Sequence, residues 1–219
     1  MTTISFSGID GAGKSTQVIE LQFWLRHCGL RSKLVTFWDD IAVLSRFRGF
    51  VSHHRVFQGD QGIGSPEKPL NRRDKNVTSW PVTAMRFCFY LADVLSLRLR
   101  VRAVRNRDTD VVIFDRFIYD ELANLPLDHA WAKAFASVVL KIAPKPDIAY
   151  VIDSDPVAAR ARKPEYPLDF LRRNRKAYLT LSRLAGDITV IEPGSIDIAQ
   201  TSIRQKMVQK LSTTKAMAS

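Results

Sequence analysis

The sequence has little of what marks secreted, membrane-spanning or zinc-stabilised proteins. Its only cysteines among 219 residues, Cys28 and Cys88, supply neither a disulfide framework nor a metal-ligand spacing. No apolar run approaches the roughly 20 residues that a membrane-spanning helix needs. No basic segment precedes Thr2, Thr3 and Ile4, so we expect no signal peptide and a reducing, cytoplasmic setting.

Acidic residues are also in short supply relative to basic ones. Lys and Arg number 33 and Asp and Glu 22, which leaves a formal net charge of +11. Such a field attracts nucleotides, nucleic acid or an anionic membrane surface without selecting among them. The remaining composition, 46% hydrophobic and 25% charged, is that of a globular chain. At this length about 70% of the unfolded surface can be buried, so we expect one domain spanning 1–219.

The apolar patterning predicts alternating strands and helices. Short apolar runs predict strands at 4–7, 34–37, 111–114, 148–152 and 188–191. Helical spacing predicts a helix from Lys14 to a stop at Gly29, and further helical regions at 80–107, 128–143, 155–185 and 196–211. This alternation favours right-handed βαβ units and hence a three-layer α/β fold, with a parallel sheet of about five strands and helices on both faces.

One stretch, at about 38–80, interrupts this pattern. It contains a predicted short helix at 41–51 and a segment at 58–79, rich in Gly, Pro, Asn and Asp, that is too long for an ordinary connection. The cations of that segment, which form either a phosphate clamp or a solvated loop, are Arg72, Arg73 and Lys75. Arginines also crowd the second half of the 80–107 helix, either as a solvated face or as a nucleic-acid patch.

The most specific signal is a glycine-rich turn between the first predicted strand and helix. The pattern G-x-x-x-x-G-K-S/T is matched by Gly8, Ile9, Asp10, Gly11, Ala12, Gly13, Lys14 and Ser15, with Thr16 following. Glycines let backbone N–H groups surround phosphate oxygens, and the helix N-terminus adds positive potential. In such a turn Lys14 neutralises the β- and γ-phosphates and the Ser15 hydroxyl ligates Mg²⁺. The sequence therefore predicts a site for ATP and Mg²⁺.

A second candidate site follows the apolar strand at 111–114. Asp115 and Arg116 come directly after it, and ligands of an open parallel sheet gather at the carboxyl ends of its strands. Asp115 is a candidate for holding Mg²⁺ or orienting an acceptor. Arg116 either binds a phosphate with two parallel hydrogen bonds or forms a structural salt bridge.

Taken together, these motifs resemble the thymidylate kinases, which belong to the nucleoside monophosphate kinase-like P-loop enzymes. The resemblance covers 1–37, 84–125 and 145–211 and is carried by FSGIDGAGKSTQ, VVIFDRF, DFLRRNRKAYLTL and VIEPGSID. It implies the P-loop NTPase fold. It also implies transfer of the γ-phosphoryl group of ATP, with Mg²⁺, to a nucleoside monophosphate, and dTMP is the first candidate for this acceptor. It also implies a homodimer.

The resemblance implies roles for single residues on the acceptor side. Asp10 would hold the acceptor sugar or order its phosphate region. Arg116 would bind the acceptor phosphate, while Asp115 orients the acceptor and Mg²⁺. Tyr90 falls where the family places an aromatic ring that stacks on thymine, although a core aromatic is the alternative.

The resemblance also implies a short lid at about 155–168 that closes over ATP. The lid carries three cations, Arg160, Arg162 and Lys163. Because the glycine-rich turn contains no Arg, the lid arginines would stabilise the charge that develops during transfer.

The acceptor side departs from the family pattern at two places. Phe37-Trp38-Asp39 stands where the family has Arg-Glu-Pro, and Val94 stands where it has another Arg. Candidate replacements are Arg86 and, in the 38–80 insertion, Arg46, Arg48, Arg72 and Arg73. The sequence therefore leaves open a kinase of a different phosphorylated acceptor, or a non-kinase ATP-binding or hydrolysing module that docks nucleic acid or protein.

Overall fold

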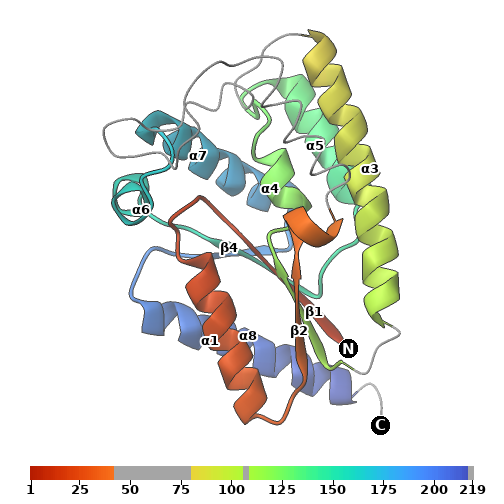
Figure 1. The fold of residues 1–219 in the computed structure, drawn as a ribbon, viewed down its shortest axis with the longest axis vertical. Helices are drawn as coiled ribbons and strands as arrows, with labels where there is room; N and C mark the ends of the chain where they lie inside the picture. Colours follow the sequence, from red (N-terminus) through yellow and green to blue (C-terminus); the bar gives the residue numbers. More distant parts are fainter. Residues whose placement is uncertain (42–79, 106–108, 217–219) are drawn as a thin grey trace.

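Five parallel strands form one sheet with the order β2-β3-β1-β4-β5. The strands are β1 (Thr2–Ser7), β2 (Ser32–Thr36), β3 (Val111–Asp115), β4 (Ile148–Ile152) and β5 (Ile188–Ile191). The computed structural model describes residues 1–41, 80–105 and 109–216 (Figure 1). All five predicted strands are confirmed, and the last two have the predicted bounds. Residues 42–79 of the expected insertion at about 38–80, which include its arginines and nearly all of the helix expected at 41–51, lie outside the described residues.

Helices cover both faces of the sheet. In Figure 1, α1 (Lys14–His27) and α8 (Ile196–Ala216) lie together on one face. The other face is covered by α3 (Trp80–Arg105), α4 (Ile118–Leu122), α5 (Ala130–Ile142) and α7 (Leu168–Ala185). Because both faces are covered, every residue of β1 and β4 is buried, and β4 reads as an apolar run in the sequence. The three-layer fold predicted from the sequence is confirmed.

Two elements differ from the sequence prediction. The helical region expected at 155–185 is divided into α6 (Pro156–Arg162) and α7, and the break between them contains Pro164 and Pro167. A proline lacks the N–H that a continuing helix would need. The short helix α4 was not predicted, because its five residues are all buried and show no amphipathic period. A π-helical turn, η1 (Phe37–Ile41), follows β2.

The core lies on both sides of β1. The Phe6 ring stacks on the ring of Tyr150 in β4, with centroids 5.3 Å apart. The Tyr150 hydroxyl donates a hydrogen bond to the Ile203 carbonyl oxygen at 3.2 Å, which joins the sheet to α8. No helix among the described residues has the length and apolar character to cross a membrane.

The strand register brings three loops together. Phe6 of β1 lies beside Asp115 of β3, and Ser7 lies beside Val151 of β4. The segments that leave β1, β3 and β4 therefore begin at the same edge of the sheet. These segments contain the glycine-rich turn, the Asp115-Arg116 pair and the start of the expected lid.

Gly8 marks the closest approach between the glycine-rich turn and β4. Its φ is 142°, and a Cβ atom built on it would lie 2.5 Å from the Ile152 carbonyl oxygen. We predict that Gly8→Ala lowers the free energy of unfolding by about 2–4 kcal/mol, because it combines an unfavourable backbone conformation with a clash against backbone. The matched control is Gly194→Ala, whose Cβ would lie 3.9 Å from its nearest neighbour and should change stability by less than about 0.5 kcal/mol. Urea unfolding measures both, and equal stability of the two variants would contradict the prediction.

Candidate active site

The glycine-rich turn joins β1 to α1 and leaves a space beside the start of the helix. Gly13 has a φ of 93°, and a Cβ built there would meet nothing within 4 Å. The space next to the Gly13 Cα atom is therefore open to a ligand. No side chain caps the first turn of α1 in the described part of the chain. The N–H groups at the start of α1 thus suit an anion, as the sequence predicts.

Lys14 lies buried beneath this turn. Its Nζ donates hydrogen bonds to the carbonyl oxygens of Gly8 at 2.7 Å and Ile9 at 2.9 Å. Burial, and then the charge of Arg116, lower the pKa of Lys14 from 10.5 to about 8. Phosphate oxygens that replaced the two carbonyl oxygens would stabilise the charged ammonium.

Ser15 and Asp115 supply the oxygens that a hard cation prefers. Ser15 is exposed in the first turn of α1, and Asp115 is half-buried at the end of β3. Burial raises the pKa of Asp115. A hydroxyl and a carboxylate are the donor types that Mg²⁺ takes in phosphate sites, so the two residues fit the expected ion.

Arg116 is held between two carboxylates. Its Nη2 atom lies 2.5 Å from Asp10 Oδ1, and its Nη1 atom lies 3.4 Å from Asp120 Oδ1. Burial favours a raised pKa for Asp10, but the charge and hydrogen bond of Arg116 together with the charges of Lys14 and Lys163 outweigh it, and the pKa falls to about 2. Asp10 and Asp115 both act on the charge of Lys14, and Arg116 contacts Asp10, so the structure brings together these predicted donor and acceptor residues.

The backbone conformation of Arg116 fixes the direction in which its side chain leaves the chain. Arg116 has a φ of 69°, the one left-handed backbone among the described residues other than glycine. Its N–H donates a hydrogen bond to the Phe6 carbonyl oxygen at 2.9 Å, which continues the register of β1 with β3. Such a conformation costs about 1–3 kcal/mol and persists where neighbours impose it, commonly at functional sites.

Sequence analysis did not find Asp120, a buried carboxylate behind Arg116. It accepts hydrogen bonds from the Ser7 hydroxyl at 2.6 Å, the Phe117 N–H at 3.0 Å and the Tyr178 hydroxyl at 2.8 Å. The signal in the sequence is an acidic residue at the third position of a helix, where its side chain can accept from the backbone N–H before the helix. That signal is weak because α4 is so short.

The expected lid packs directly on the glycine-rich turn. The helix α6 begins at an N-cap, Asp155, whose carboxylate accepts from the Ala158 N–H at 2.9 Å. A Cβ built on Gly11 would lie only 2.2 Å from the Ala159 carbonyl oxygen, so α6 approaches the turn as closely as a glycine allows. This contact places the lid helix beside the candidate ATP site.

The lid cations have partners within the protein. Arg162 donates from Nη2 to the Ser154 hydroxyl at 2.6 Å and from Nε to the Ala158 carbonyl oxygen at 3.2 Å. Lys163 lies 3.3 Å from Glu165, and its charge also helps to lower the pKa of Asp10. Arg160 is partly exposed on α6. Their roles in phosphoryl transfer stay predictions.

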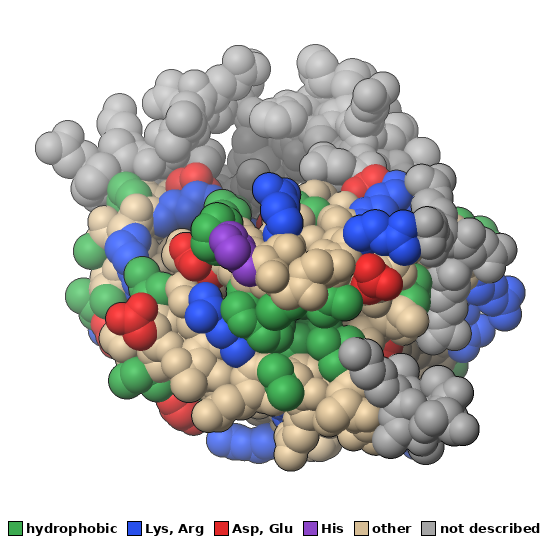
Figure 2. Space-filling model, turned by 90° about the horizontal axis from the view of Figure 1, so that it is seen from below, with side chains coloured by type: hydrophobic (Ala, Val, Ile, Leu, Met, Phe, Trp, Pro, Cys, Tyr) green, Lys and Arg blue, Asp and Glu red, His purple; other side chains and the backbone are tan. Residues whose placement is uncertain are grey.

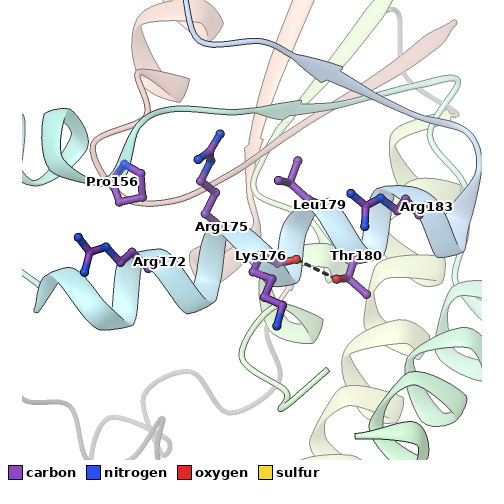
Figure 3. Close-up of a pocket in the computed structure, with 7 residues that line it drawn as sticks. All are labelled: Pro156, Arg172, Arg175, Lys176, Leu179, Thr180 and Arg183. Carbon is purple, nitrogen blue, oxygen red and sulfur yellow. Dashed lines mark hydrogen bonds between the residues drawn. The ribbon is translucent and has the colours of Figure 1, made fainter. Parts of the chain in front are cut away.

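A second buried carboxylate fixes α7 to the end of β4. Asp153 accepts two parallel hydrogen bonds from Arg175, each at 2.7 Å. Figure 3 shows Arg175 extending away from α7, and both Arg175 and Pro156 line a cavity of about 290 Å³. That cavity is lined by α7 and Pro156 and by no residue of the glycine-rich turn. The arginine-to-carboxylate pair thus joins α7 to the end of β4, and the cavity beside it is distinct from the glycine-rich turn.

The base-stacking role of Tyr90 stays a prediction. The Tyr90 side chain is buried, and its ring centroid lies 6.4 Å from that of Phe135. This environment agrees with the core-aromatic alternative. Arg86, the expected replacement cation, belongs to α3, but its side chain lies outside the described part of the structure.

The net positive charge does not gather on the face shown in Figure 2. Lys and Arg side chains on this face alternate with Asp and Glu side chains and with apolar ones. A nucleic-acid site is usually marked by a basic patch or stripe on one face. This face therefore offers no support for the nucleic-acid alternative.

The lowered pKa of Lys14 predicts a pH-dependent stability. The unfolded chain binds the Lys14 proton up to about pH 10.5, while the folded chain releases it near pH 8. Stability should therefore rise with pH between these values, because the unfolded state then binds more protons. We expect the unfolding free energy of the parent to rise by about 3 kcal/mol relative to Lys14→Met over this window. A difference that stays constant with pH would contradict the burial of a charged Lys14.

The whole chain has relatives among the thymidylate kinases, although no family model matches it. It is 25% identical over 218 residues to a probable thymidylate kinase of Methanosphaera stadtmanae, covering 95% of this chain and 98% of that protein. It is 26% identical over 207 residues to a probable thymidylate kinase of Methanothermobacter thermautotrophicus, covering 92% of each. The crystal structure of thymidylate kinase from Ehrlichia chaffeensis shares the fold, with a TM-score of 0.58 and 16% identity over 94% of this chain and 98% of that one. In its sequence along nearly the full length, and in its fold, the chain is thus similar to proteins named as thymidylate kinases.

Proposed function

We propose that this protein is a nucleoside monophosphate kinase that transfers the γ-phosphoryl group of ATP to dTMP, giving ADP and dTDP. The observation that carries the proposal is the meeting of Lys14, on the donor side, and Arg116, on the acceptor side, across Asp10 at one edge of the sheet. Both curated relatives are named probable thymidylate kinases, which supports the choice of dTMP.

The donor side is the glycine-rich turn with the first turn of α1. The open space at Gly13 and the N–H groups that begin α1 would receive the phosphates of ATP. Lys14 would exchange the Gly8 and Ile9 carbonyl oxygens for phosphate oxygens. Ser15 and Asp115 would hold Mg²⁺, which when bound neutralises phosphate charge.

The acceptor side depends on Arg116 and Asp10. The guanidinium can hold two oxygens of a phosphate in parallel, and it now contacts one oxygen each of Asp10 and Asp120. Asp10, whose side chain is 12% exposed, would exchange Arg116 for a hydroxyl of the acceptor sugar. Phe37 and Val94, at the positions where the resemblance places arginines, are buried apolar residues, which increases the dependence on Arg116.

Catalysis would consist of positioning and charge stabilisation. The glycine-rich turn, the end of β3 and the lid converge on one place, so the two phosphates would be held in line without water between them. Arg160, Arg162 and Lys163 would add positive charge from the lid, where α6 already touches Gly11. Fixed positive groups of this kind stabilise charge that develops in the transition state.

The test is ADP release from ATP and Mg²⁺ with dTMP, with dUMP, with other nucleoside monophosphates and with no acceptor. We expect dTMP to raise the rate by at least about tenfold over the acceptor-free rate. Lys14→Ala should lower that rate by about 100-fold or more while the variant stays folded, because it removes a charge that contacts the transferred group. Lys145→Ala, which removes an exposed cation paired with Asp187 at the opposite edge of the sheet, is the matched control.

Two results would contradict the proposal. One is ADP release that does not differ across the acceptors while ATP still binds. The other is near-parental turnover by a folded Lys14→Ala variant.

A further inference from the structure

We propose that Asp120 is a positioning residue for phosphoryl transfer: from its buried place it holds the Arg116 guanidinium in the orientation that receives the acceptor phosphate. The inference rests on the proposed function for its meaning in catalysis. Its structural part, the anchoring of Arg116 by Asp120, stands on the contacts alone.

The Asp120 carboxylate gathers donors from three parts of the fold. Its Oδ2 atom accepts from the Ser7 hydroxyl, at the end of β1, and from the Phe117 N–H, before α4. Its Oδ1 atom accepts from the Tyr178 hydroxyl on α7 and lies 3.4 Å from Arg116 Nη1. Both oxygens are thus fixed by groups on regular elements, which gives the carboxylate a defined place.

Burial excludes Asp120 from direct contact with a nucleotide. Its side chain is 1% exposed, against 24% for Arg116 and 12% for Asp10. Burial and the charge of Asp120 raise the pKa of Tyr178 well above its ordinary value, so the hydroxyl keeps its proton and continues to donate. Asp120 can therefore act on a substrate through Arg116.

The two carboxylate partners of Arg116 differ in what they can do. Asp10 is on the glycine-rich turn and faces the site, where an acceptor sugar would draw it away from Arg116. Asp120 is held from behind by Ser7, Phe117 and Tyr178 and has no such freedom. When Asp10 changes partner, Asp120 is the carboxylate that keeps the guanidinium in place. An arginine oriented in advance loses less entropy on binding, so Asp120 should lower the KM for the acceptor.

The anchor also joins the acceptor side to the lid. Tyr178 belongs to α7, which follows α6 after the break at 163–167. A hydrogen bond from Tyr178 to Asp120 therefore connects the helix behind the lid to the residue that orients Arg116.

The test compares Asp120→Asn with Asp128→Asn. Asp120→Asn keeps the size of the side chain but removes its charge and one acceptor oxygen. Asp128 forms an exposed ion pair, at 2.6 Å, with Lys176, which lies on α7 as Tyr178 does. Asp128→Asn therefore makes the same chemical change away from the site. We expect Asp120→Asn to raise the KM for dTMP about tenfold while the KM for ATP stays within about twofold, and Asp128→Asn to change neither.

A second readout does not depend on activity. In nuclear magnetic resonance spectra the guanidinium N–H signals of Arg116, assigned by their loss in Arg116→Lys, report how firmly the side chain is held. We expect their exchange with water to quicken about tenfold in Asp120→Asn, with the backbone spectrum otherwise preserved. If Asp120→Asn does not fold, Tyr178→Phe is the second variant, because it removes one hydroxyl that donates to Asp120. We expect it to raise the KM for dTMP and the guanidinium exchange rate about threefold each.

The outcomes separate the inference from the proposed function. Unchanged guanidinium exchange in the folded variant would overturn the inference, whatever the enzyme's acceptor. Equal increases in both KM values, or an Asp120→Asn effect that persists undiminished in an Arg116→Lys background, would overturn it as well, since either would indicate a general structural role. If the parent shows no acceptor-dependent turnover, the proposed function fails and the exchange measurement still decides whether Asp120 anchors Arg116.

Discussion

The parallel register of β1, β3 and β4 is the constraint on which the rest of the site depends. It sets Phe6 beside Asp115 and Ser7 beside Val151, so the three segments that leave these strands begin side by side. The glycine-rich turn then makes two close backbone contacts that only glycine allows. Gly8 passes against the Ile152 carbonyl and Gly11 against that of Ala159. A sheet with another strand order would separate these segments, and no change of side chains would restore the site.

The cations of the site are already bound to oxygens of the protein. Lys14 holds two loop carbonyls, Arg116 holds two carboxylates, and Arg162 holds the Ser154 hydroxyl. Binding a phosphate therefore exchanges one oxygen partner for another and does not neutralise a bare charge. Such an exchange keeps the fold stable without a ligand and limits the affinity for inorganic anions, because an isolated anion must compete with partners held in place. Asp10 and Asp120 divide this work, one beside the ligand and one behind Arg116.

Much of the fold and the donor side could be predicted from the sequence because their signals are local. Strands β3, β4 and β5 contain contiguous apolar runs, and the turn from Gly8 to Ser15 is one uninterrupted pattern. The hydrogen bonds of Asp120 could not be predicted, since Ser7 and Tyr178 lie 113 and 58 residues away and carry no local pattern. Tyr90 shows the limit of a resemblance, because a position alone does not say whether a ring packs in the core or against a base.

The most direct test of the account is the binding of one molecule that spans both halves of the site, with adenosine and thymidine joined through five phosphates. If donor and acceptor sides meet between Lys14 and Arg116, calorimetry should show it binding about 100-fold or more tightly than ATP alone. Lys14→Ala and Arg116→Ala should each weaken it. An affinity equal to that of ATP, reduced by Lys14→Ala and untouched by Arg116→Ala, would contradict the account by showing that no acceptor site adjoins the glycine-rich turn.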